Sequence, residues 1–585
     1  MKPMCASLLE GRTLMKSIRD LDFSPNGEYF PSPVDWRDVV LYSLLVDRFD
    51  NGSCQPNSKN PRRRTTQRPP ESRQVFQGGN LRGIMRRLDY LAGMGIDGLW
   101  LSPIFKNRPE RDDTYHGYGI HNFLAVDPRF GTMEDLCELV DMAHARGMYV
   151  ILDIVANHTG DNWAYEADKF CEYSSEFNQP YPFGFWRKVS SGGNGTSNDA
   201  VWPKELQFKR CYMRRGTIRD LKVEGAEAIE GDFGTLKKLD IQRQEVLDTL
   251  IRIYKFWIRS TDIDGFRLDA AKHMDPHSTA LFCSAIREYA RMLGKHNFLI
   301  FGEIAAGYQT IQQYLKGCAF CSGNGHRLHG IDAALDFPLS YIVERVVKGF
   351  SSPEEIRWVY NGTNPLYANG RDPGMNSVTF LDNHDRNQRF MYGNPYPQQL
   401  ELALGFLLTS LGVPSIYYGT EQAFDGGGPD LHYVRECMFG GTWGAFDSCG
   451  ESYFDRGHPI YRSISRITAI RRKEPALRYG RQYFRETGPN GVDFAHPMDR
   501  HCTLAYSRVM DETEILVALN LEFTPRKDFI IVDFNLHRDG EWMTDLLRPG
   551  TRYRIVERNG RKMVQISLDA LQMAILKKDS FVSSG

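Results

Sequence analysis

Short apolar stretches alternate with longer amphipathic stretches along most of the chain. The short stretches are rich in β-branched and aromatic residues and carry few polar positions, which predicts strands that are buried on both faces. The longer stretches have apolar residues at helical spacing. In residues 243–260, for example, Leu247, Ile251 and Ile258 fall on one stripe. The pattern therefore predicts the strands of a parallel sheet, with helices between them.

Eight such apolar stretches follow one another, and helical stretches separate most of them. The predicted strands are residues 39–49, 96–103, 148–155, 264–271, 298–304, 330–337, 377–384 and 413–420. The predicted helices include residues 81–95, 132–147, 243–260, 276–295, 398–411 and 459–473. Eight strand–helix units of this kind close into an α/β fold, the (β/α)8 TIM barrel, whose active site lies at the carboxyl ends of the strands.

Two regions break the alternation. Residues 159–235 are rich in Gly, Asn, Ser, Tyr and Trp, have no sustained period, and are too many for a simple loop. We interpret them as a subdomain inserted after the third strand, so that the barrel comprises residues 39–158 and 236–477. From there on, alternating patterns with turns between them predict a C-terminal antiparallel β-sandwich domain over residues 478–585. Residues 1–38 are an N-terminal extension that the pattern does not place.

Composition and charge exclude several classes of function. The chain has 585 residues, of which 41% are hydrophobic, enough for a large domain with satellites. Its net charge of −1 gives no global field that would favour nucleic acid or an anionic membrane. No apolar run approaches the ~18–20 residues that a membrane span needs. The N-terminus has no continuous apolar segment of the kind that signal peptides carry, so we expect a cytoplasmic protein.

The eleven cysteines are scattered and odd in number. Without an export signal, we interpret them as reduced thiols. Cys318 and Cys321 form a lone C-x-x-C motif with no second pair nearby, which favours free thiols over a zinc site. The basic stretch at residues 60–73 is expected to be a solvated loop, with an interaction site as the alternative.

Charged side chains gather at the ends of four predicted strands, where a barrel has its active site. A buried charge is costly unless it is paired. One such residue could be a structural hydrogen-bond hub, but four groups at equivalent positions are hard to explain by packing. The groups are Asp153, Asn157 and His158 on strand three; Arg267, Asp269, Lys272 and His273 on strand four; Glu303 on strand five; and Asp382, Asn383, His384 and Asp385 on strand seven.

Three carboxylates at one barrel mouth suit glycoside hydrolysis. Retaining enzymes use two carboxyl groups ~5–5.5 Å apart, one as nucleophile and the other as acid and then base. Arg267 lies two residues before Asp269 and so faces the same side of the strand, and we expect it to keep the pKa of Asp269 low. Glu303 has apolar neighbours and two other carboxylates close by, which raise the pKa of a carboxyl group. The pattern predicts an ionised Asp269 and a protonated Glu303.

Several segments carry a family resemblance. In order and spacing, four of them resemble the signature regions of the α-amylase family, glycoside hydrolase family 13: "DIVANH" (153–158), "GFRLDAAKH" (265–273), "GEI" (302–304) and "FLDNHD" (380–385). Two more, "YHGYGIHNFLAVDPRFGT" (115–132) and "GDFGTLKKLDI" (231–241), are similar to further regions of that family. The resemblance covers about residues 40–480, and a C-terminal β domain is usual in the family.

The resemblance implies a role for each site residue. Asp269 would be the nucleophile, Glu303 the acid and base, and Asp385 a third carboxylate that binds sugar hydroxyls and favours a distorted ring. Arg267 would position the nucleophile, and Asp153 would orient Arg267. The remaining implied substrate-binding residues are Tyr118, stacked under the sugar; His158 and His384, hydrogen-bonded to it; and Lys272 and His273, on the leaving-group side.

Calcium is the candidate cofactor that the resemblance implies, and no organic cofactor is implied. Many relatives hold a calcium ion between the barrel and the inserted domain. Asn157 and Asp232 match positions used for it, and the backbone carbonyl of His273 could contribute. Oxygen ligands suit calcium. These ligands are few, however, and Asn157 could instead hydrogen-bond a loop.

The implied activity is retaining hydrolysis of α-1,4-glucosidic bonds in maltodextrin, starch or glycogen. Ala270, directly after the nucleophile, resembles the α-1,4-acting branch. The segment "LKKLD" (236–240) departs from the "LPDLD" of many amylases and leaves the subfamily open. A glucanotransferase or an α-glucosidase, maltogenic or sucrose-acting, stays open as well, because hydrolysis and transglycosylation share one covalent intermediate. A non-catalytic binding scaffold would have lost the nucleophile or the acid, and both are present.

Overall fold

The computed structural model describes residues 15–52, 75–175, 179–189, 199–315, 328–360, 377–439 and 452–579. The basic stretch at residues 60–73 and the Cys318–Cys321 motif lie outside these ranges. In the part of the chain that is described, no helix combines the length and the apolar character that a membrane crossing requires.

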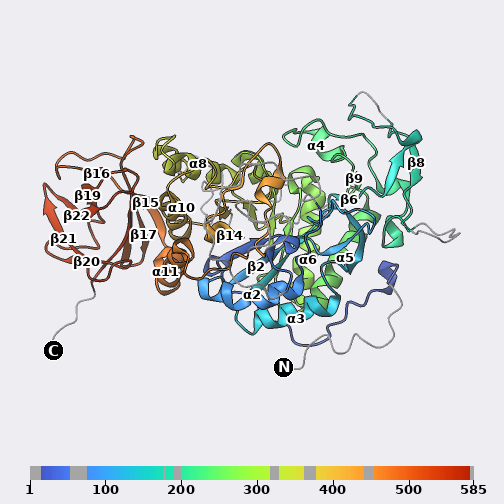
Figure 1. Cartoon of the computed structure of the whole chain (residues 1–585), viewed down its shortest axis with the longest axis horizontal. Helices are drawn as coiled ribbons and strands as arrows, with labels where there is room; N and C mark the ends of the chain where they lie inside the picture. Colours follow the sequence, from blue (N-terminus) through green and yellow to red (C-terminus); the bar gives the residue numbers. More distant parts are fainter. Residues whose placement is uncertain are drawn as a thin grey trace.

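Eight parallel strands close into a barrel, which confirms the predicted fold (Figure 1). Each strand lies within one of the predicted apolar stretches, and nearly all strand residues are buried. In the order of their hydrogen-bonded neighbours, the strands are β1 (Leu41–Leu44), β14 (Val413–Tyr417), β13 (Ser377–Phe380), β12 (Ala333–Leu335), β11 (Leu299–Gly302), β10 (Gly265–Leu268), β5 (Tyr149–Ile154) and β2 (Gly98–Leu101). The first predicted strand was too long, because residues 46–49 form the short helix α1 (Val46–Phe49).

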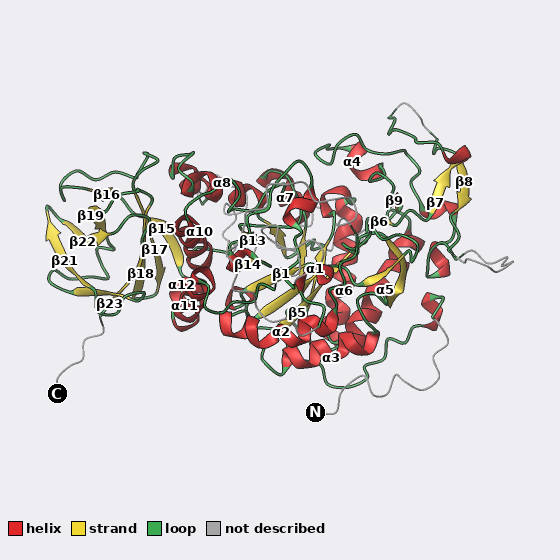
Figure 2. Ribbon diagram, viewed as in Figure 1, coloured by secondary structure: helices red, strands yellow, loops and turns green. Residues whose placement is uncertain are grey.

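Helices surround the barrel on the outside (Figure 2). Local sequence sets their ends. Thr132 accepts a hydrogen bond from the amide of Asp135, and Asp135 accepts one in return from the amide of Thr132, so the predicted N-cap is a full capping box. The helices that follow the barrel strands are α2 (Leu81–Met94), α3 (Met133–His144), α5 (Gln244–Thr261), α6 (Pro276–Met292), α7 (Tyr308–Leu315), α8 (Phe337–Val347), α9 (Glu354–Val359), α10 (Pro397–Thr409), α11 (Pro459–Lys473) and α12 (Pro475–Tyr479).

The described part of the N-terminal extension packs against the amino-terminal end of the barrel. The Trp36 side chain is 1% exposed and belongs to the apolar cluster inside the barrel, together with Leu41 and Val413. Its indole nitrogen donates a hydrogen bond to the carbonyl of Asn297 over 2.8 Å. The extension therefore closes the end of the barrel opposite the predicted active site.

Inside the barrel, apolar side chains give way to charged ones toward the carboxyl ends of the strands. Arg267 on β10 pairs in register with Asp153 on β5 and with Phe301 on β11. The ring of Phe301 meets Trp100 edge-on at 5.3 Å, and the Arg267 guanidinium lies 5.5 Å from the centre of the Trp100 ring. The charged side chains therefore pack directly against aromatic rings in the barrel interior.

The chain between β5 and β10 contains the region that we proposed as an inserted subdomain. It forms two small antiparallel pairs, β6 (His158–Thr159) with β9 (Lys237–Lys238) and β7 (Trp163–Tyr165) with β8 (Phe183–Trp186). The short helix α4 (Ala226–Glu230) follows β8. In the first pair, His158 is directly opposite Lys238. This register ties the end of the third barrel strand to the far end of the insertion.

The C-terminal strands form an antiparallel β domain, drawn in orange to red in Figure 1. The first part of β21 pairs with β20 and its second part pairs with β22, so one strand joins two halves of a nine-stranded sheet. Both halves contribute side chains to one apolar cluster. The strands are β15 (Arg481–Phe484), β16 (Thr487–Gly488), β17 (Thr503–Met510), β18 (Thr513–Asn520), β19 (Arg526–Ile531), β20 (Trp542–Asp545), β21 (Arg552–Arg558), β22 (Arg561–Leu568) and β23 (Met573–Lys578).

The expectation that all cysteines are reduced is wrong at one position. Cys137 is disulfide-bonded, and its partner is not among the described residues. The other cysteines in the described ranges are free thiols: Cys171, Cys211, Cys283, Cys437 and Cys502.

Candidate active site

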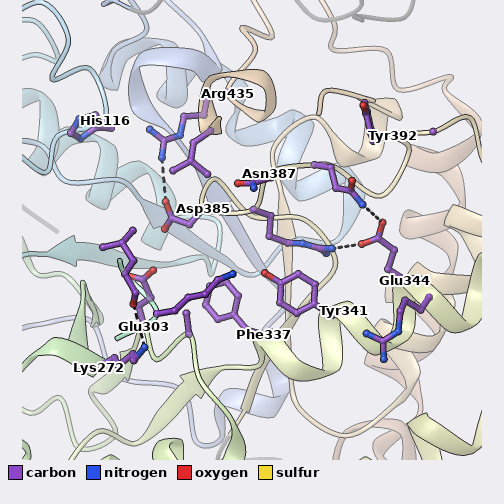
Figure 3. Close-up of a pocket in the computed structure, with 18 of the residues that line it drawn as sticks. His116, Lys272, Glu303, Phe337, Tyr341, Glu344, Asp385, Asn387, Tyr392 and Arg435 are labelled. Atoms are coloured by element: carbon purple, nitrogen blue, oxygen red, sulfur yellow. Dashed lines mark hydrogen bonds and ion pairs between the residues drawn. The ribbon is translucent and has the colours of Figure 1, made fainter. Parts of the chain in front are cut away.

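A cavity of about 1220 Å³ opens at the carboxyl ends of the barrel strands. This volume exceeds the 300–1,000 Å³ or so that is typical of a pocket for one drug-sized ligand. Asp269, Glu303 and Asp385 all line the cavity, although they come from three different strand ends. Figure 3 shows Glu303 and Asp385 facing the cavity from neighbouring walls.

Arg267 lies at the centre of the carboxylate cluster and is fully buried. One terminal nitrogen of its guanidinium donates to Asp153 over 2.9 Å and to Asp269 over 2.8 Å. The other lies 2.8 Å from a Glu303 oxygen and 3.6 Å from an Asp385 oxygen. The two terminal nitrogens of one guanidinium, called here the Arg267 fork, therefore contact both Asp269 and Glu303, the residues proposed to do the chemistry. The fork fixes the separation of these two side chains.

A sharp turn directly after Asp269 helps to place Glu303. Ala270 adopts a left-handed conformation with φ of 49°, and the chain enters the 3₁₀ helix η8 (Ala271–His273). This turn aims the Ala270 amide at Glu303, which accepts a hydrogen bond over 3.1 Å. The end of β10 therefore supplies a cation, a carboxylate and an amide donor to the same site.

Burial sets the direction of the pKa shifts of the two central carboxyl groups. Desolvation raises the pKa of Asp269 well above its usual value; the Arg267 charge opposes this, and the Glu303 charge adds to it. Desolvation likewise raises the pKa of Glu303, with Arg267 again opposing it. The expected high pKa of Glu303 is confirmed. The expected low pKa of Asp269 is wrong, because desolvation outweighs the arginine.

Asp385 differs from its two neighbours. Burial would raise the pKa of its carboxyl group, but His384, Arg435 and Arg267 together hold that pKa well below the usual range. A ring nitrogen of His384 lies 2.9 Å from the carboxylate, and Arg435 donates to it over 3.2 Å. Asp385 is therefore the one of the three carboxylates whose ionised form is favoured.

Asp153 and Tyr118 support this cluster. Asp153 is fully buried and does not line the cavity; it accepts hydrogen bonds from Arg267, from the Trp100 indole over 3.2 Å and from the Tyr118 hydroxyl over 2.9 Å. The Tyr118 ring lines the cavity, and its hydroxyl also lies 2.8 Å from a ring nitrogen of His384. These contacts agree with the orienting role expected for Asp153.

His158 faces Asp269 from the side of the inserted subdomain. Its Nε2 atom lies 4.0 Å from an Asp269 oxygen and has no hydrogen-bond partner among the described residues. Burial, with the nearby Lys238, lowers the pKa of His158 to about 3. A neutral imidazole with an open ring nitrogen is suited to hydrogen-bond a sugar hydroxyl at this point.

Lys272 and His273 line the cavity on the same side. The Lys272 ammonium donates to the Leu221 carbonyl over 3.2 Å, and a His273 ring nitrogen lies 3.1 Å from the Ala228 carbonyl. Both contacts reach residues of the inserted subdomain. The end of β10 therefore fastens that subdomain over the cavity.

The candidate calcium ligands do not fit a calcium ion. The Lys238 ammonium donates to the Asn157 side-chain oxygen and to the His273 carbonyl, the two oxygens that a cation between them would need. Asp232 accepts instead from the Lys238 amide over 2.8 Å and from the Tyr165 hydroxyl over 2.7 Å. No group of three or more His, Cys, Asp or Glu side chains in the described ranges could hold a metal ion.

Sequence reasoning missed several residues that line the cavity. Arg435 comes from a loop without a period, and nothing in its local sequence points to the barrel mouth, whereas His116 lies within the motif at residues 115–132 but was not singled out. Burial, with the nearby Arg435, lowers the pKa of His116 to about 3. Across the cavity, Arg386 and Gln388 both contact the Glu344 carboxylate, which Figure 3 shows beside Tyr341. The motif at residues 380–385 could have drawn attention to Arg386, its direct neighbour.

Comparison with known proteins relates this site to one family. The family model "Alpha amylase, catalytic domain" matches residues 43–438. An α-amylase of Streptomyces lividans is 32% identical over 494 residues, which cover 76% of this chain and 52% of that protein. A cyclomaltodextrin glucanotransferase of Geobacillus stearothermophilus is 29% identical over 459 residues, 76% of this chain and 56% of that protein. The chain thus spans about half the length of these two relatives.

Solved structures show the same relation at the level of the fold. The crystal structure of an α-amylase from Geobacillus thermoleovorans, complexed with acarbose, superimposes with a TM-score of 0.67 at 26% sequence identity. The match covers 94% of this chain and all of that one.

Proposed function

Because this chain belongs to the α-amylase family by its catalytic domain, we propose that it is a retaining enzyme that cleaves α-1,4-glucosidic bonds of maltodextrin-, starch- or glycogen-type glucans. The single observation that carries the proposal is the Arg267 fork, which holds Asp269 and Glu303 side by side in a cavity large enough for an oligosaccharide. Asp385, held ionised next to the same guanidinium, completes the set.

The first half of the reaction forms a glycosyl–enzyme ester. Asp269 attacks the anomeric carbon, and the bond from that carbon to the bridging oxygen breaks. Glu303 delivers its proton to the leaving oxygen, which departs as the free 4-hydroxyl of the other glucan fragment. Asp385 accepts hydrogen bonds from sugar hydroxyls and stabilises the positive charge that develops on the ring. The raised pKa of Glu303 favours the protonated form that this step needs.

In the second half, Glu303 acts as a base. It takes a proton from water as the water oxygen attacks the anomeric carbon, and the ester bond to Asp269 breaks. Two inversions at one carbon give net retention. An acceptor sugar in place of water would give transglycosylation, which makes a glucanotransferase the second candidate. The similarity to a cyclomaltodextrin glucanotransferase supports that candidate.

Product analysis tests the proposal. Purified enzyme would be incubated with maltoheptaose, maltose, sucrose and pullulan, and the products separated by chromatography. Hydrolysis predicts shorter maltooligosaccharides from maltoheptaose, whereas transfer predicts longer or cyclic products. Absence of any cleavage of maltoheptaose would contradict the proposed function. NMR of fresh products should show the α anomer first, and a β anomer appearing first would rule out the double displacement.

The cysteines bear on the cytoplasmic location that we propose. The five free thiols fit a reducing compartment, whereas the disulfide at Cys137 fits an oxidising one. Cell fractionation with an activity assay would decide between the two. Activity outside the cytoplasmic fraction would contradict the proposal.

A further inference from the structure

A buried lysine stands where the family resemblance implies a metal ion. Lys238 is 1% exposed, and its ammonium donates to the side-chain oxygen of Asn157, at the end of β5, and to the carbonyl of His273, at the end of β10. Lys238 itself belongs to β9, which pairs with β6. One positive charge therefore joins two barrel strands to the inserted subdomain.

The surroundings of this ammonium leave no place for a divalent cation. Calcium takes six to eight oxygen ligands at about 2.3–2.6 Å. Here the two available oxygens are already bound by the lysine. The acidic candidate ligand, Asp232, accepts from the Lys238 amide and from the Tyr165 hydroxyl. Lys238 is also the third residue of "LKKLD", the segment whose sequence departs from the "LPDLD" of many amylases by replacing its first aspartate with a lysine.

We propose that the Lys238 ammonium replaces calcium as the cation that fastens the inserted subdomain to the barrel. Its effect reaches the catalytic site through His158, the neighbour of Asn157 and the residue opposite Lys238 in the β6–β9 pair. If the ammonium were lost, two buried oxygens would lack a donor and His158 would lose the register that aims its ring at Asp269. Lys238 is thus a positioning residue, and folding and activity should require no calcium at this place.

The test compares Lys238→Met with a matched control, Lys237→Met, in the presence of EDTA. Lys237 is the adjacent residue of the same short strand, but its ammonium lies over the Trp163 and Tyr165 rings and 3.9 Å from an Asp232 oxygen, so this control reports the loss of a buried lysine charge that is not at Asn157 and His273. We expect the wild type to contain much less than one calcium per chain by elemental analysis and to keep its melting temperature and kcat in EDTA. Lys238→Met should melt several degrees lower and lose kcat/KM severalfold, with a smaller loss for Lys237→Met.

Two results would overturn the proposal. One is an equivalent of calcium that is bound to the wild type and lost from Asn157→Ala. The other is a Lys238→Met variant whose melting temperature in EDTA equals that of the wild type. Because these readouts need no particular substrate, they remain informative if the proposed α-1,4 specificity is wrong.

A different observation concerns the far part of the active-site cavity. Five exposed aromatic side chains line it: Tyr341, Phe350, Tyr392, Tyr396 and Phe523. The first four belong to the barrel region, whereas Phe523 comes from the loop between β18 and β19 of the C-terminal domain. The ring centroids of Tyr396 and Phe523 lie 5.6 Å apart, so the two domains together form one aromatic surface. We call these five side chains the aromatic ledge.

The aromatic ledge has the chemistry of a sugar-binding surface. Exposed aromatic rings in one contiguous hollow mark a binding site rather than packing. Polar side chains line the same cavity, including Asn387 and Gln388 (Figure 3 labels Asn387 between Asp385 and Tyr392). Flat apolar rings beside amide groups suit the alternating apolar faces and hydroxyl edges of a pyranose chain. The ledge is continuous with the cavity of the catalytic carboxylates, which identifies its occupant as the same glucan.

We infer that the aromatic ledge binds glucose units remote from the cleaved bond and that the C-terminal domain thereby contributes to substrate selection. This inference rests on the proposed function. The test measures kcat/KM of Phe523→Ala on maltoheptaose and on maltotriose, with Phe534→Ala as control, because Phe534 is an exposed ring of the same domain outside the cavity. Loss of one stacked ring should cost about threefold to tenfold on maltoheptaose and little on maltotriose.

Calorimetric titration of maltoheptaose into Glu303→Gln, with and without Phe523→Ala, should show the same loss in affinity. Equal kcat/KM losses on both substrates, or no loss on either, would overturn the inference. A wild type inactive on both substrates would instead contradict the proposed function.

Discussion

Arg267 faces more negative charge than it can neutralise. Four carboxyl groups contact its guanidinium, from Asp153, Asp269, Glu303 and Asp385. Asp385 is held ionised, whereas desolvation raises the pKa of both Asp269 and Glu303, so a proton in this cluster is favoured on one of these two groups. The proposed mechanism needs that proton on Glu303. The arginine favours this state through its direct hydrogen bond to Asp269.

The first prediction concerns the proposed nucleophile and acid. Asp269→Asn and Glu303→Gln should each lower kcat by about a thousandfold or more, because each group acts mainly in the transition state. The melting temperature should stay level or rise, since each change removes a buried like charge. Azide should partly restore activity to Asp269→Gly, and to Glu303→Ala with an activated substrate. Near-full activity of Asp269→Asn on maltooligosaccharides would refute the assignment.

The second prediction concerns Arg267. Arg267→Lys keeps the charge but loses the fork, so kcat should fall strongly while the barrel stays folded. In Arg267→Ala the pKa of Asp269 should rise further, and the acidic limb of the kcat/KM profile should move to higher pH. Rate profiles against pH, with melting curves for both variants, measure this. If Arg267 only packs the barrel mouth, activity will fall in proportion to stability and the limb will not move.

At the scale of secondary structure elements, the barrel strands were predictable because burial on both faces leaves a plain apolar run of the right length. The site residues at the ends of β5, β10, β11 and β13 were predictable for the same reason, since each lies at a fixed place after such an apolar run. Arg435 was not predictable, because it lies in a loop. The hydrophobic periodicity of a sequence does not show which loop residue will contact Asp385. Lys238 was missed because a long side chain on a two-residue strand can lie in several directions. The pKa of Asp269 was misjudged because sequence shows the arginine but not the depth of burial.

The third prediction concerns the closed end of the barrel. Trp36→Ala should lower the free energy of unfolding by about 3–5 kcal/mol, because it leaves a void among the barrel's interior side chains. KM should not change, since Trp36 lies at the opposite end of the barrel from the catalytic cavity. Chemical denaturation and a standard assay measure the two quantities. Val34→Ala is the control, since Val34 is 97% exposed. A large change in KM for Trp36→Ala would show that the two ends of the barrel are coupled.

At the scale of the whole molecule, three parts of the chain meet at one cavity. The barrel supplies the carboxylates, and the C-terminal domain adds Phe523. Backbone carbonyls of the inserted subdomain contact the side chains of Lys272 and His273. Figure 1 shows the insertion and the C-terminal domain on opposite sides of the barrel. The cavity therefore depends on the arrangement of the whole chain, although the carboxylates proposed for the chemistry all lie in the barrel.

The fourth prediction concerns acid stability of the complete fold. The pKa of His116 is lowered to about 3 by burial, whereas an unfolded histidine titrates near 6.5. Between these values the unfolded chain binds the extra proton, so this residue's share of stability is complete above pH 6.5 and is lost as the pH falls toward 3. The loss is at most about 1.4 kcal/mol per pH unit.

His116→Gln should therefore narrow the difference in unfolding free energy between pH 7 and pH 5. Denaturation curves of both proteins at the two pH values measure it. An unchanged difference would show that His116 does not stay neutral in the folded protein over this pH range.

The Lys238 ammonium has a consequence for how this fold responds to its surroundings. A bound ion stabilises a protein by an amount that grows with its free concentration and disappears on dilution. A cation carried on a side chain cannot diffuse away, so the group is present in every folded molecule, and its charge depends on pH because burial lowers the pKa of Lys238 to about 7. Rinsing, phosphate or competing chelators cannot remove it. The contact between the insertion and the barrel therefore depends on a residue of the chain itself and does not require an ion from the solution.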